Sequence, residues 1–118
     1  MKKIITVHIQ LYRGNFFIVF SNIFNNILLK FSSGCAGFKN SKKRNWDSLL
    51  YLLSYSVLLI NKYYNNFNIF LKIEGGKKNK IQKTVNFFIE SLHIYGIEII
   101  GLKIIIKIAH GGCKKPKN

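Results

Sequence analysis

The chain has 118 residues, 48% of them hydrophobic, so it can build one modest core and is too apolar for a disordered basic tail. It carries 19 Lys and Arg against four acidic residues, which gives a formal net charge of +15. A compact particle with this charge attracts polyanions, so the composition predicts nucleic acid or an anionic membrane as the partner.

The amino-acid usage is strongly biased. Ile, Lys and Asn supply 49 of the 118 residues, and Lys outnumbers Arg 17 to 2. AT-rich codons specify these three amino acids, which indicates an AT-rich genome such as that of an organelle. The first residues have neither the Arg- and Ser-rich character of an import presequence nor the apolar run of a signal peptide. We therefore expect a protein made inside the compartment where it works.

Three strands are predicted in the first part of the chain, at 3–11, 15–21 and about 26–32. Residues rich in β-branched and aromatic side chains fill each of them, and "YRGN" between the first two predicts a hairpin turn. A polar, glycine-bearing stretch follows at 33–45.

A helix is predicted at about 46–63, with Asn45 as its cap and Asp47 in its first turn, where the helix dipole favours a negative charge. Ser54 and Lys62 belong to its polar side. Apolar side chains at helical spacing predict the buried face, which comprises Trp46, Leu49, Leu50, Leu53, Val57 and Ile60.

A fourth strand is predicted at 68–73, followed by the flexible basic loop "EGGKKN", a second helix at about 79–94 and a last strand at about 97–106. Gly96 is placed to end the helix in a left-handed conformation. The expected buried face of this helix comprises Ile81, Val85, Phe88, Leu92 and Tyr95, and the expected solvent face comprises Lys83, Asn86, Glu90 and His93.

The predicted order is β-β-β-α-β-α-β, which indicates one α/β domain over residues 1–118 with a mixed sheet and a basic tail at about 107–118. The most apolar runs, 49–60 and 97–108, are shorter than the roughly 20 residues of a membrane span, so both are expected in the core. The cations concentrate outside the helices, which argues against a basic amphipathic helix on a membrane surface.

A metal site would have to use His110 and Cys113, with Cys35 and either His8 or His93 as further ligands. Zinc sites usually combine two close-spaced ligand pairs, and this sequence has one. The four acidic residues, with Asp47 at a helix start and Glu74 in a loop, show no convergent pair for hydrolytic chemistry. We therefore expect no enzyme activity, metal, cofactor or small-molecule substrate.

Three glycine-bearing or terminal segments carry clustered cations. Glycine lets a backbone approach a phosphate closely, and neighbouring cations then supply charge, so the pattern predicts binding to structured nucleic acid. The cations are Lys39, Lys42, Lys43 and Arg44 in the first segment, Lys77, Lys78 and Lys80 in the second, and Lys114, Lys115 and Lys117 in the third.

Two of these segments resemble a known family. "GFKNSKKR" at 37–44 is similar to the "GFRGSRK" loop, and "HGGCKKPKN" at 110–118 is similar to the closing "HNGCRPPKKRRV", of the universal small-subunit ribosomal protein called S-eleven in the bacterial series. The resemblance covers roughly residues 7–118. Gly111 stands where the family has Asn, Lys115 replaces one of two prolines, and the terminal arginine cluster is missing.

The resemblance implies a ribonuclease-H-like fold without catalysis and a structural role on the platform of the small subunit. It implies contacts with small-subunit rRNA, with neighbouring platform proteins and with the region of the messenger RNA exit. Beside the cations above, the residues it assigns to rRNA are Gly37, Phe38, Ser41, His110, Gly112, Cys113 and Pro116. Gly111 and Gly112 are expected to allow a turn that directs the tail lysines at RNA, with Pro116 stiffening it.

Together these features predict an organelle-encoded ribosomal protein of the mitochondrial matrix, with the plastid as the alternative compartment. A free-standing basic nucleic-acid chaperone is the alternative function.

Overall fold

The computed structural model describes residues 3–12, 15–32 and 46–105. The order of its elements is the predicted β-β-β-α-β-α-β. The elements are β1 (Ile4–Tyr12), β2 (Asn15–Ser21), β3 (Ile27–Ser32), α1 (Trp46–Tyr63), β4 (Asn68–Gly75), α2 (Lys78–Ile94) and β5 (Ile99–Ile105).

The strands form a mixed sheet in the order β3-β2-β1-β4-β5. Antiparallel pairing joins β1 to β2 and β2 to β3, and parallel pairing joins β1 to β4 and β4 to β5. Tyr12 pairs with Asn15, which confirms the predicted hairpin; Arg13 and Gly14 of its turn lie outside the described residues.

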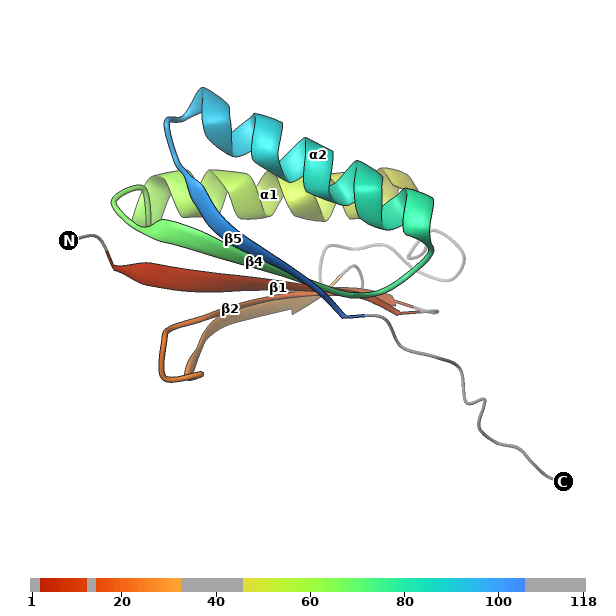
Figure 1. The fold of residues 1–118 in the computed structure, drawn as a ribbon, viewed down its shortest axis with the longest axis horizontal. Helices are drawn as coiled ribbons and strands as arrows, with labels where there is room; N and C mark the ends of the chain where they lie inside the picture. The colour runs from red at the N-terminus through yellow and green to blue at the C-terminus, as the bar shows by residue number, and fades with distance from the viewer. Residues whose placement is uncertain (1–2, 13–14, 33–45, 106–118) are drawn as a thin grey trace, which may run out of the picture.

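Both helices lie on one side of this sheet (Figure 1). The strand order explains this arrangement. The connection through α1 moves from β3 to β4 and the connection through α2 from β4 to β5, both in the same direction across the sheet. Right-handed crossovers that advance in one direction place their helices on the same face. One face is therefore covered by helices, and no described helix covers the other.

Alternation along the strands separates the two faces. On β1, Ile5, Val7 and Ile9 are fully buried under the helices, whereas His8 and Gln10, which point to the opposite face, are half-buried. Paired residues of neighbouring strands share a face, so the core extends through Ile18 and Phe20 of β2 and Ile69, Leu71 and Ile73 of β4. We name the two sides of the sheet the helix face and the open face.

The predicted helix faces are largely confirmed. Four of the six residues expected in the α1 core, Leu49, Leu53, Val57 and Ile60, are buried. Trp46 and Leu50 are half-buried. Asn45 and the Asp47 side chain lie outside the described residues, so their predicted capping roles stay predictions.

In α2, Ile81, Phe88 and Leu92 are buried as expected. Tyr95 is not: it caps the helix and is 42% exposed, because the chain turns away there. Gly96 has φ of +72° and ends the helix in the predicted left-handed conformation.

The connection between β4 and α2 corrects one prediction. The basic loop expected at 74–79 is reduced to two residues, Gly76 and Lys77, because β4 continues to Gly75 and α2 begins at Lys78. Glu74 and Gly75 pair with Gln10 and Leu11 of β1, and Glu74 is 8% exposed. The short connection fixes the start of α2 directly at the end of β4.

Candidate nucleic-acid interface

One transverse row of the sheet connects the ends of all five strands. Ser32 pairs with Phe17, Phe17 with Gln10, Gln10 with Glu74, and Glu74 with Ile105. Ser32 precedes the segment 33–45 and Ile105 precedes the segment 106–118, neither of which belongs to the described residues. The row therefore places the attachment points of two predicted rRNA-binding segments at the same end of the sheet, which we call the basic end.

The third predicted segment starts from the same row. Gly75 follows Glu74, and both Gly75 and Gly76 have positive φ, +81° and +82°. A Cβ on Gly76 would also lie 2.9 Å from Leu11 Cδ1. This turn therefore requires glycine, both for its backbone conformation and for its contact with β1.

Lys77 and Lys78 are exposed where this turn leads into α2. Lys77 is the N-cap in an extended conformation, without a side-chain hydrogen bond to the cap, and the first turn of α2 holds no acidic residue. The N-terminus of a helix carries partial positive charge, which usually favours acidic side chains. Lysines here add to that positive potential, so an anion at this position would gain from both sources.

Two aromatic contacts hold the start of α2 in place. Lys80 Nζ lies 5.1 Å from the centre of the Phe16 ring on β2, and Lys83 Nζ lies 5.5 Å from the Trp46 ring. Trp46 is the first residue of α1 and the first described residue after 33–45. The residue that follows that segment is thus attached to the first half of α2.

The structure therefore brings Lys77, Lys78 and Lys80 together at the basic end, although Lys78 is in the helix and not in the predicted loop. The remaining predicted rRNA-binding residues lie outside the described residues, and their roles stay predictions. They are Gly37, Phe38, Lys39, Ser41, Lys42, Lys43, Arg44, His110, Gly111, Gly112, Cys113, Lys114, Lys115, Pro116 and Lys117.

Glu74 does not lie in a loop, as the sequence led us to expect. Its Oε1 is 2.9 Å from Nε2 of His8 across the parallel β1–β4 pair, on the open face. His93 is exposed on α2, on the other side of the sheet. His8 and His93, two of the three histidines weighed as zinc ligands, therefore do not converge. The described residues contain no group of three or more His, Cys, Asp and Glu side chains that could hold a metal ion.

Sequence reasoning missed the cations that lie on strands. Lys30, Lys72 and Lys103 point to the open face, two residues before the row that defines the basic end. Alternation along β4 could have assigned Lys72 to a face. The neighbours of each lysine depend on the pairing of strands far apart in the chain, which no local signal gives.

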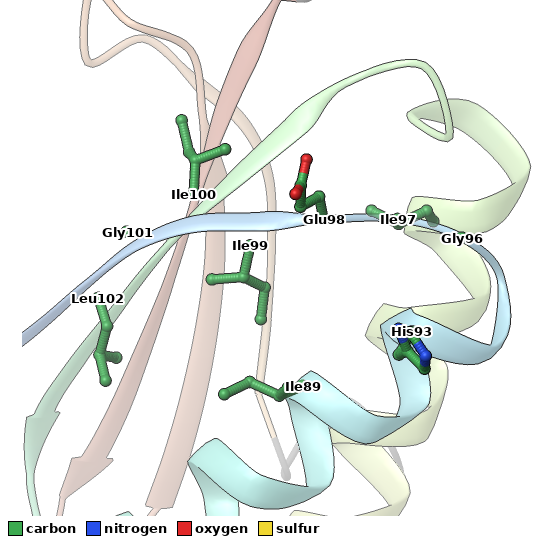
Figure 2. A pocket seen from close by; sticks show the side chains of 9 residues that line it. All are labelled: Ile89, His93, Gly96, Ile97, Glu98, Ile99, Ile100, Gly101 and Leu102. Carbon is green, nitrogen blue, oxygen red and sulfur yellow. The ribbon is translucent and has the colours of Figure 1, made fainter.

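A separate hollow of about 600 Å³ lies between α2 and β5. Figure 2 shows Ile99 and Leu102 pointing from β5 toward the side of α2, where Ile89 and His93 lie. Glu98 also lines it, and no lysine does. This hollow therefore lacks the cations of a phosphate site.

Within the described residues, no helix is both long and apolar enough to cross a membrane.

The fold and the basic end define a compact, strongly basic α/β protein suited to a polyanionic partner. No protein-family model matches the sequence. The chain is 32% identical over 122 residues to the small ribosomal subunit protein uS11m of Prototheca wickerhamii, an alignment that covers 98% of this chain and 86% of that protein. The chain therefore belongs to the uS11 family of small ribosomal subunit proteins, the family that its two basic motifs resemble.

Proposed function

We propose that this chain is a structural constituent of the small subunit of the mitochondrial ribosome and binds small-subunit rRNA without catalysing a reaction. The observation that carries the proposal is the transverse row from Ser32 to Ile105. This row gathers the attachment points of three separate basic segments at one end of the sheet. Segments joined so closely can meet one folded RNA together, which dispersed surface lysines could not do.

The proposed mechanism is charge neutralisation during assembly. Lys77 and Lys78 would meet phosphates at the start of α2, the loop at 37–44 would act from the β3 side, and the tail at about 107–118 from the β5 side. The whole chain, 1–118, acts as one domain in this proposal. Lys in place of Arg keeps the charge and gives up bidentate phosphate geometry, so the contacts would rely on position and number.

The finer location also belongs to this proposal. The relative is named as a mitochondrial protein. The bias toward Ile, Lys and Asn, whose codons are AT-rich, fits a gene carried by the organelle itself. We place the protein on the platform of the small subunit, beside other platform proteins and near the messenger RNA exit, as the family resemblance implies. The plastid is the alternative compartment.

Co-sedimentation tests the proposal. We expect the native protein to remain with small-subunit particles through a sucrose gradient at moderate salt. With about 6–10 phosphates engaged, affinity for rRNA should fall roughly 10³- to 10⁵-fold between 50 and 200 mM salt. A protein whose affinity for RNA falls steeply with salt, but which stays out of the particles, would instead be a free-standing nucleic-acid chaperone.

Variants at the basic end test the site. Lys77→Gln/Lys78→Gln should weaken rRNA binding and leave the fold intact, because both side chains are exposed. Lys42→Glu/Lys43→Glu and deletion of 114–118 should each have the same effect. Circular dichroism checks folding, and a chain that unfolds after any of these changes would contradict the assignment.

A further inference from the structure

A second row of paired residues crosses the open face beside the basic end. Lys30 pairs with Val19, Val19 with His8, His8 with Lys72, and Lys72 with Lys103. Because paired residues share a face, three lysines and a histidine from four different strands point to the same side of the sheet. These lysines are 42 and 31 residues apart in the chain, so only the strand pairing aligns them.

The row lies beside a hollow of about 270 Å³. Thr6, His8, Lys30 and Lys72 are among its lining residues. Lys30 and Lys103 are exposed and Lys72 is half-buried. The ring of Phe17 lies 5.7 Å from Lys30 Nζ, a cation–π contact that holds this ammonium group on the open face.

Lysines at paired positions of neighbouring strands repel each other. Lys72 and Lys103 are in this position, and like charges directly opposite destabilise a sheet. A carboxylate on this face, Glu74, is buried and contacts His8. Three lysines against this carboxylate leave the row with a net positive charge. An anion bound across the row would relieve the repulsion, so charge complementarity favours a polyanion.

The row is also continuous with the basic end. Lys30, Lys72 and Lys103 each stand two residues before a member of the first row, Ser32, Glu74 or Ile105, which is about 6.6 Å along the strand. From β3 to β5 the row spans four strand spacings, about 19 Å. An RNA backbone that reaches the basic end can therefore continue across the open face and stay within the region of positive potential.

We propose that the open face is a second rRNA-binding surface, in which Lys30, Lys72 and Lys103 contact phosphates of the RNA backbone. The inference rests on the proposed function and assigns to it a surface separate from the basic end. An acidic protein segment would meet the same charges, but RNA is favoured because the row adjoins the segments assigned to rRNA.

The salt dependence of binding measures these contacts. Full-length wild-type chain and the Lys72→Gln/Lys103→Gln variant are titrated with transcribed small-subunit rRNA at several KCl concentrations. The control of equal charge change is Lys3→Gln/Lys62→Gln, which removes two exposed lysine charges from positions outside the row. The slope of log K against log salt is negative, and each lost phosphate contact reduces its magnitude by about 0.7 to 0.9.

We expect the magnitude of the slope to be smaller than that of wild type by about 1.4 to 1.8 in the Lys72→Gln/Lys103→Gln variant. The slope of the control should stay within about 0.3 of the wild-type value. Adding Lys30→Gln to the first variant should reduce the magnitude further. An unchanged slope in the first variant, or an equal fall in the control, overturns the proposal. In both cases wild-type binding and co-sedimentation would persist, so the proposed function would stand. A wild-type chain that neither binds rRNA nor enters the particles overturns both proposals.

Lysine acetylation within assembled subunits distinguishes whether RNA or protein covers the open face. Lys103 should react in the free chain, be protected in the particle and become reactive again after ribonuclease digestion. Protection that survives complete digestion of the RNA would show a protein on this face and would overturn the proposal.

Discussion

The helix face and the open face of the sheet come from the same strands and differ in almost every property. On β1, Ile9 is fully buried against the helices, while the neighbouring Gln10 on the open face is half-buried. The helix face holds a continuous apolar core, and the open face holds Lys30, Lys72 and Lys103. The apolar core is therefore concentrated on one face of the sheet.

The largest expected effect separates the two faces on a single strand. Ile9→Ala should lower the free energy of unfolding by about 2–5 kcal/mol, because it leaves a cavity in the core. Gln10→Ala should change it by about 0.5 kcal/mol or less. Urea denaturation followed by circular dichroism measures both. Similar losses in the two variants would contradict the division of the sheet into a buried helix face and an open face.

A smaller effect is expected at the crowded part of the open face. A Cβ on Gly101 would lie 2.6 Å from two ring atoms of Phe70, so a side chain there must displace the ring. Gly101→Val should cost about 1–3 kcal/mol of unfolding free energy. Phe70→Leu should recover part of that loss in the double variant. If the losses of unfolding free energy in the two single variants simply add in the double variant, the Phe70 ring is not what excludes a side chain at position 101.

The contact between His8 and Glu74 on the open face is expected to have a comparable effect. His8→Ala removes a partner that lies 2.9 Å from the buried Glu74 carboxylate and should destabilise the fold by about 1–3 kcal/mol. The double variant His8→Ala/Glu74→Gln should be more stable than His8→Ala, since the buried charge is gone. Thermal unfolding measures the difference, and a double variant that is less stable than His8→Ala would rule out this explanation.

The smallest expected effect concerns the end of α2, away from the basic end. Gly96→Ala should cost about 1–2 kcal/mol, because φ of +72° strains any residue with a Cβ, although no atom lies within 4 Å to clash. Gly96→Asn should cost less, since Asn tolerates this region. Neither change should alter the salt dependence of rRNA binding. A loss of binding would place α2's C-terminus in the interface.

The sequence alone determined the element order, because periods of 2 and 3.6 in the apolar residues are local. It gave β2 within its observed bounds, 15–21, and α1 at 46–63. It placed Lys78 in a loop, where the structure has the first residue of α2. It misplaced Glu74, whose contact His8 is 66 residues away in the chain. It also misplaced Tyr95, which caps α2 where the chain turns away.

Only the tertiary structure decided which residues lie side by side across the sheet. Parallel pairing of β1 with β4 and of β4 with β5 sets a register that no turn specifies, since a whole helix or more separates the partners. That register forms the row from Ser32 to Ile105 and the row from Lys30 to Lys103. Local sequence patterns gave each lysine its strand. The long-range pairing of the backbone brought those lysines together as one positive surface.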